Sequence, residues 1–75
     1  MNIDSTVIRR LRELHRKSLA EMASMVGVSE SHLFRIEAGQ RSITDAFRHR
    51  FIAVLDLTPD KLRRLLAMYE DTRIT

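Results

Sequence analysis

The chain has 75 residues, of which 44% are hydrophobic and 31% are charged, and its formal net charge is +3. This length and composition indicate one small globular domain over residues 1–75, with only one proline and two glycines to interrupt regular structure. The chain has no cysteine, no apolar stretch long enough to span a membrane and no signal-peptide pattern at its start. The lack of cysteine excludes disulfides. The lack of a membrane-spanning stretch and of a signal peptide predicts a protein that remains in the cytoplasm.

The first predicted helix covers about residues 6–16 and is capped by Asp4 or Ser5. Its buried stripe consists of apolar residues at helical spacing, namely Val7, Ile8, Leu11 and Leu14. Its outer face carries the charged residues Arg9, Arg10, Glu13, Arg16 and Lys17. We interpret this face as solvated, with Glu13 paired to Arg9 and Lys17, and direct contact with phosphates is the alternative.

The stretch from Ser18 to Gly39 is the most informative, because it predicts two short helices joined by a tight turn. Ser18 and Glu21 have the spacing of a capping box, so a helix begins near Leu19. Gly27 ends this helix, since glycine readily adopts a positive φ. A small residue on the buried face lets the next helix cross closely. That face holds Met22, Ala23 and Val26.

The next helix covers about residues 30–38, with Ser29 as its cap and Gly39 after its end. Leu33 and Ile36 form its buried stripe. Two helices joined by so short a turn are typical of a helix-turn-helix, in which the second helix enters the major groove of DNA. The outward positions of this second helix hold Ser29, Glu30, Ser31, Phe34 and Arg35.

A polar loop, residues 40–45, leads to the fourth predicted helix, with Ile43 packing back into the core. Thr44 or Asp45 caps this helix, which runs to about Leu55. The two phenylalanines of the helix lie on a single stripe, so we interpret them as core residues and not as platforms for stacked bases. The buried residues are Phe47, Phe51, Val54 and Leu55.

The fifth predicted helix begins after the cap Thr58, with Pro59 at its first position. It continues to about Glu70. Leu62 and Leu66 are assigned to the core. Other apolar residues are candidates for a dimer surface, and the alternative is that they only close a small bundle. These candidates are Leu65, Met68, Tyr69 and Ile74.

Many small matches at fixed spacing resemble the lambda-repressor-like helix-turn-helix family, which includes phage repressors and Cro proteins. The resemblance covers about residues 7–66. It implies an all-α, five-helix fold with the helix-turn-helix formed by helices 2 and 3. Residues 67–75 follow the matched part as a helix end and tail, which we regard as a candidate for dimerisation. The matching positions are Leu11, Arg12, Ser18, Glu21, Met22, Ala23, Gly27, Val28, Ser29, Leu33, Ile36, Glu37, Gly39, Leu55 and Leu62.

The resemblance also implies roles for individual residues. An ion pair between Arg12 and Glu37 locks the first helix to the third. Among the outward residues, Arg35 can donate hydrogen bonds to guanine, and Glu30 can accept a hydrogen bond from the amino group of cytosine. The predicted base contacts are Ser29, Glu30, Ser31 and Arg35. Phosphate contacts fall to polar residues at helix starts and in the loop after the third helix, namely Ser18, Gln40, Arg41, Ser42 and Thr44.

These features predict a sequence-specific transcriptional regulator of bacterial or phage type, acting as a repressor in the nucleoid. We expect a homodimer on a pseudo-palindromic double-stranded DNA operator. We expect no enzymatic activity, cofactor, metal, small-molecule ligand or membrane partner. His15, His32 and His49 are isolated from one another, and the serines at helix starts are caps.

Two positions depart from the family pattern. Leu19 stands where the family usually has a glutamine that holds a phosphate. Phe34 is an outward aromatic near Glu30, whose carboxylate repels phosphates. The departures leave open an alternative function, a protein-interaction module such as an antitoxin subunit or an antirepressor, which binds a toxin or a repressor. RNA binding is a weaker alternative, since the chain lacks an aromatic platform for bases.

Overall fold

Five α-helices and no strand form the part of the chain that the structure, a computed structural model, describes: residues 1–74, with side chains up to Asp71. The predicted all-α fold is confirmed. The side chain of Ile74, a predicted dimer contact, lies outside the described residues. The helices are α1 (Ser5–Leu14), α2 (Leu19–Val26), α3 (Glu30–Glu37), α4 (Asp45–Leu55) and α5 (Pro59–Ile74).

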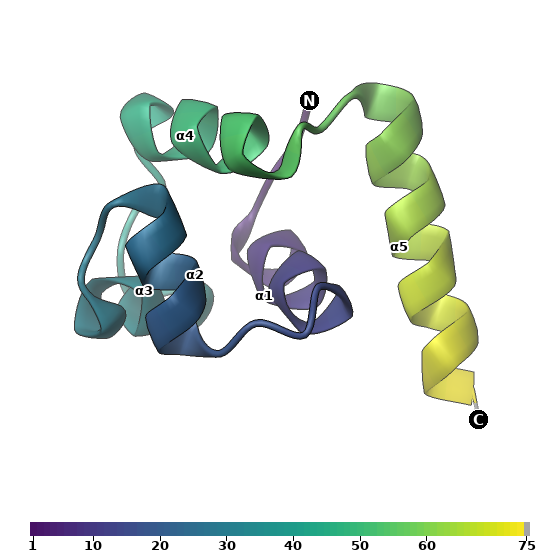
Figure 1. The fold of residues 1–75 in the computed structure, drawn as a ribbon, viewed down its shortest axis with the longest axis horizontal. Coiled ribbons are helices and arrows are strands. Elements are labelled where there is room, and N and C mark those ends of the chain that lie inside the picture. Colours follow the sequence, from purple (N-terminus) through teal and green to yellow (C-terminus); the bar gives the residue numbers. More distant parts are fainter. Residues whose placement is uncertain (75) are drawn as a thin grey trace.

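Helix α1 lies at the centre of the arrangement, between the α2–α3 pair and α5 (Figure 1). It packs against α3 and α5, while α2 packs against α3 and α4. The α2–α3 pair and α5 are therefore at opposite ends of the molecule (Figure 1). Apolar stripes of the helices meet in one core, and its helical members are Ile8, Leu11, Met22, Ala23, Val26, Leu33, Ile36, Phe47, Phe51, Leu55 and Leu62.

The helices begin at side chains that accept a backbone hydrogen bond. Each cap takes the N–H group three residues later, at 2.9–3.1 Å, which satisfies a donor that the helix itself leaves unpaired. Where the sequence left two candidates, the structure selects Asp4 over Ser5 and Thr44 over Asp45. The caps are Asp4, Ser18, Ser29, Thr44 and Thr58.

Two helix ends differ from the prediction. α1 stops at Leu14 instead of residue 16, because Arg16 has a positive φ of 53° and the Lys17 N–H turns back to the Arg12 carbonyl. No glycine marks this end, so the sequence pattern did not reveal it. α5 continues to Ile74 instead of Glu70, since no glycine or proline follows Pro59 to interrupt it.

Polar contacts between α1 and α5 correct the prediction for the outer face of the first helix. The Tyr69 hydroxyl donates to Glu13 at 3.0 Å. Arg10 lies over the Tyr69 ring, with its guanidinium carbon 5.1 Å from the ring centre, and pairs with Glu70 at 3.1 Å. Arg10 therefore faces α5 instead of solvent, and Glu13 bonds to α5 instead of pairing with Arg9.

The same contacts bear on the candidates for a dimer surface. Leu65 is half-buried and packs against the core, and Tyr69 is occupied by α1. Both side chains therefore contact other parts of the same bundle, and their place in a dimer surface stays a prediction. Met68 is 54% exposed and remains a candidate for contact with a second copy.

Two core residues lie outside the helices. Ile3, before α1, and Leu57, between α4 and α5, are both buried. Neither belongs to a helical stripe, so helical periodicity could not identify them. Ile43, in the loop before α4, is half-buried against the same core, as predicted.

Candidate nucleic-acid interface

The turn between α2 and α3 is built from local backbone geometry. Gly27 caps α2 with a φ of 75°, and the Val28 N–H then donates to the Ala23 carbonyl at 3.0 Å. Arg50 on α4 donates to the Val26 carbonyl at 2.9 Å, which satisfies another acceptor at this helix end. The position of α3 relative to α2 is thus held by backbone bonds as well as by the core.

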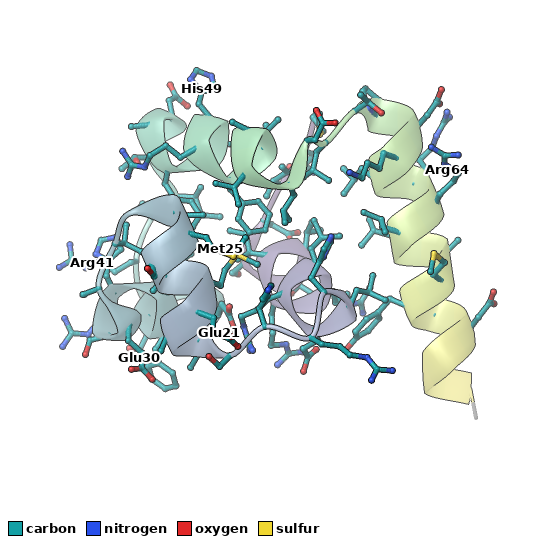
Figure 2. The ribbon with its side chains drawn as sticks, in the orientation of Figure 1. Glu21, Met25, Glu30, Arg41, His49 and Arg64 are labelled. Carbon is teal, nitrogen blue, oxygen red and sulfur yellow. The ribbon has the colours of Figure 1, made fainter. Side chains whose placement is uncertain are left out.

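Helix α3 presents one apolar and one exposed face. Leu33 and Ile36 are fully buried, which turns the opposite side of the helix to solvent. Glu30 projects from the end of the molecule formed by α2 and α3, away from α5 (Figure 2). All the predicted outward residues are exposed, namely Ser29, Glu30, Ser31, Phe34 and Arg35.

The ion pair implied by the resemblance is present and anchors α3 to α1. Arg12 Nε donates to Glu37 Oε2 at 2.8 Å, and Arg12 Nη2 donates to Glu37 Oε1 at 3.0 Å. The side chains are only 15% and 7% exposed. The hydrogen bonds that Arg12 donates to Glu37 raise the pKa of Arg12 above its ordinary value. Arg12 also donates to the Lys17 carbonyl at 3.0 Å, so one guanidinium ties α1, the α1–α2 loop and α3 together.

The predicted phosphate contacts are exposed at helix starts and in the α3–α4 loop. Ser18 and Thr44 use their hydroxyl oxygens as caps, yet each hydroxyl keeps a hydrogen to donate. Arg41 projects from the same end of the molecule as Glu30 (Figure 2). The full set, Ser18, Gln40, Arg41, Ser42 and Thr44, is exposed.

Glu21 completes the capping box at the start of α2. Its carboxylate accepts from the Ser18 N–H at 2.9 Å, and the Ser18 hydroxyl accepts from the Glu21 N–H at 3.0 Å. The hydrogen bond from the Ser18 backbone lowers the pKa of Glu21 below its ordinary value. The capping box therefore satisfies two backbone N–H groups at the start of α2.

Leu19 and Phe34, the two departures from the family pattern, lie side by side. Both line a shallow hollow with Glu30, Ser31 and Arg35, and both line a second hollow with Arg9 and Arg12. Sequence patterns identified Leu19 and Phe34 separately and did not bring them together, because the two residues belong to different helices. Arg9 was assigned to the solvated face of α1, and its place in this second hollow was also missed.

Other kinds of site find little support in the described part of the chain. Within residues 1–74, no helix is long and apolar enough to cross a membrane. The described side chains hold no group of three histidine, aspartate or glutamate residues suited to a metal ion.

Comparison with protein families matches residues 5–66 to a family described as "Helix-turn-helix domain". The chain belongs to this family. The match includes α2 and α3 and ends within α5. Comparison with curated proteins and comparison with solved structures gave no match. For this helix-turn-helix protein, the family membership suggests a DNA-binding regulator.

Proposed function

We propose that this helix-turn-helix protein is a sequence-specific transcriptional repressor of the lambda-repressor-like type, which reads an operator with α3. The observation that carries the proposal is the exposed face of α3, anchored from behind by Arg12–Glu37 and bordered by donors at the starts of α2 and α4. Such donors hold phosphates, while side chains on the exposed helix face read base edges.

Individual residues have distinct roles in this proposal. Arg35 donates to guanine O6 and N7, and Glu30 accepts from the amino group of cytosine. Ser29 and Ser31 are short enough to let α3 approach the bases. Phosphate contacts fall to residues on the rim of this face, namely Ser18, Gln40, Arg41, Ser42 and Thr44.

We further propose that the protein binds as a homodimer to a pseudo-palindromic operator. A single small module makes few base contacts, so two copies on two half-sites supply the affinity that a specific regulator needs. The candidates for the dimer contact are the apolar residues of α5, Leu65, Met68 and Tyr69, of which Met68 is the most exposed at 54%.

The test is selection of bound duplexes from a randomised DNA pool, at two salt concentrations, with the wild-type protein and with Arg35→Ala and Arg41→Ala. We expect enrichment of a two-fold symmetric sequence. Arg35→Ala should relax the base preference at one position in each half-site, at a cost of about 1–3 kcal/mol. Arg41→Ala should weaken binding to all sequences and reduce the salt dependence by about one ion per half-site.

Absence of any enriched sequence, or weak binding that is indifferent to Arg35, would contradict the proposal. A second candidate function is then a protein-interaction module, an antitoxin subunit or antirepressor. Phe34, which is 54% exposed, favours this candidate, because a solvated aromatic suits a protein partner. In that case Phe34→Ala should abolish partner binding and leave any residual DNA binding unchanged.

A further inference from the structure

An apolar patch lies within the exposed face of the helix-turn-helix. It consists of Leu19, the first residue of α2, and Phe34, near the middle of α3. The two side chains form the wall shared by the two hollows described above. Phe34 is 54% exposed and Leu19 is half-buried. We call this pair the Leu19–Phe34 patch.

The surroundings of the patch are charged and favour a nucleic-acid ligand. Arg35 and Glu30 border one hollow, and Arg9, Arg12 and Glu37 border the other. Arg12 is neutralised by Glu37, whereas Arg9 is exposed and forms no ion pair with any described side chain. Arg35 and Arg9 place an exposed cation at each hollow, which suits a ligand with a small apolar group next to phosphates, and Glu30 is the carboxylate that we assign to a cytosine amino group.

The size of the patch also limits its ligand. A stable protein partner covers about 800 Å² on each side. Two side chains on separate helices supply only a small part of such an area. A single methyl group in the major groove matches them better. Among the four DNA bases only thymine carries such a methyl, at C5, and contact with a phenylalanine is one way in which proteins recognise it.

We propose that the Leu19–Phe34 patch is a specificity site that receives the C5 methyl group of one thymine in each half-site. This inference rests on the proposed operator binding. Successive helical residues are about 100° apart, so Phe34 and Arg35 flank Ser31 on opposite sides of the exposed face of α3. Phe34 therefore contacts a base on the α2 side of Ser31, and this base is next to the base that Arg35 contacts. The Leu19 side chain has no donor for a phosphate oxygen, and it contributes instead to the apolar surface that contacts the methyl group.

The experiment replaces thymine by deoxyuridine, one position at a time, in one half-site of the selected operator. This change removes the methyl group and keeps the base pairing. For the wild-type protein we expect one position at which binding weakens about fourfold, the value for burial of one methyl-sized group. Phe34→Ala should bind the thymine and deoxyuridine duplexes equally at that position, and Phe34→Leu should keep part of the preference.

Two control variants separate this contact from general effects. Met25→Ala removes an exposed apolar side chain of α2 that lines neither hollow, and it should keep the full thymine preference. Arg35→Ala should bind less tightly and also keep that preference. The wild-type comparison needs no variant at all, so poor folding of Phe34→Ala cannot hide the result.

The failures of the two proposals have different signatures. Specific binding that depends on Arg35 but ignores every thymine methyl would overturn the Leu19–Phe34 inference alone. A thymine preference that Phe34→Ala retains would also overturn it, since the methyl would then contact another residue. Absence of specific DNA binding, with capture of a protein by wild type but not by Phe34→Ala, would overturn both proposals.

Discussion

At the scale of single residues, the Arg12–Glu37 pair determines how α3 is presented. We expect Arg12→Ala or Glu37→Gln to lower the free energy of unfolding by about 2–3 kcal/mol, because each change leaves a largely buried polar group without its full hydrogen-bond partner. The double variant Arg12→Met/Glu37→Leu should lose less than the sum of the two single changes, since neither charge is then left unpaired. Urea unfolding measures all three.

The pair between Arg48 and Asp45 is a matched control. It joins residues three positions apart on α4, and Asp45 is almost fully exposed. Arg48→Ala should therefore cost less than about 1 kcal/mol. Strictly additive losses at positions 12 and 37 would show that the two residues do not act as a pair.

Glu21 makes the stability of the α2 start depend on pH. The folded-state pKa of Glu21 is lowered by the hydrogen bond from the Ser18 N–H. The ionised carboxylate therefore stabilises the fold above the pKa of the unfolded chain, and this contribution is lost as the pH falls through the folded-state pKa. In Glu21→Gln the amide still accepts the hydrogen bond but does not titrate.

Thermal melting of the two proteins from about pH 7 to about pH 3 measures this effect. We expect the wild type to be the more stable protein near neutral pH, and the difference between the two melting temperatures to shrink in acid. A constant difference over the whole range would contradict the assignment of the effect to the Glu21 carboxylate.

At the scale of elements, the α2–α3 turn depends on a backbone conformation that side chains disfavour. Gly27 has a φ of 75°, and a Cβ atom placed there would contact nothing within 4 Å. The cost of Gly27→Ala is therefore backbone strain alone, about 1–2 kcal/mol in the free energy of unfolding. Gly27→Asn should cost less, because asparagine tolerates the left-handed region. Equal losses of unfolding free energy for the two variants, measured by urea unfolding, would contradict the assignment of the cost to backbone strain.

Helix starts and helix ends differed in how well the sequence predicted them. A helix starts at a cap whose side chain accepts a hydrogen bond from the N–H group three residues later. Both residues lie in the same short stretch of sequence, so local patterns predict the start. The end of α1 depends on a positive φ at Arg16, in a segment that Arg12 reaches through the Lys17 carbonyl. That contact involves a side chain whose other partner is on α3, so local patterns could not reveal it.

At the scale of the whole molecule, the exposed face of α3 and the outer side of α5 lie at opposite ends (Figures 1 and 2). A dimer formed through Met68 would therefore hold its two copies of α3 far apart and favour well-separated half-sites. We expect Met68→Glu to reduce self-association in analytical ultracentrifugation and to weaken binding to a two-site duplex. Binding to a single half-site should be unchanged. A dimer that persists in Met68→Glu would place the interface elsewhere.

The sequence by itself determined the number and order of the helices, the helix-turn-helix and the exposed face of α3, but not the ends of α1 and α5. Each of these follows from local rules, namely caps, a glycine at the turn, and apolar residues at helical spacing. Leu33 and Ile36 alone indicate which side of α3 faces outward. The Arg12–Glu37 pair came from family resemblance, since no local rule joins residues 25 positions apart.

Only the tertiary structure decided which residues from different helices meet. It turned Arg10 and Tyr69 towards each other, and it brought Leu19 beside Phe34. Such contacts depend on the crossing of whole helices, which is set by the packing of the complete core and not by any short stretch of sequence. Periodicity specifies the face on which a residue lies, and packing decides what that face contacts.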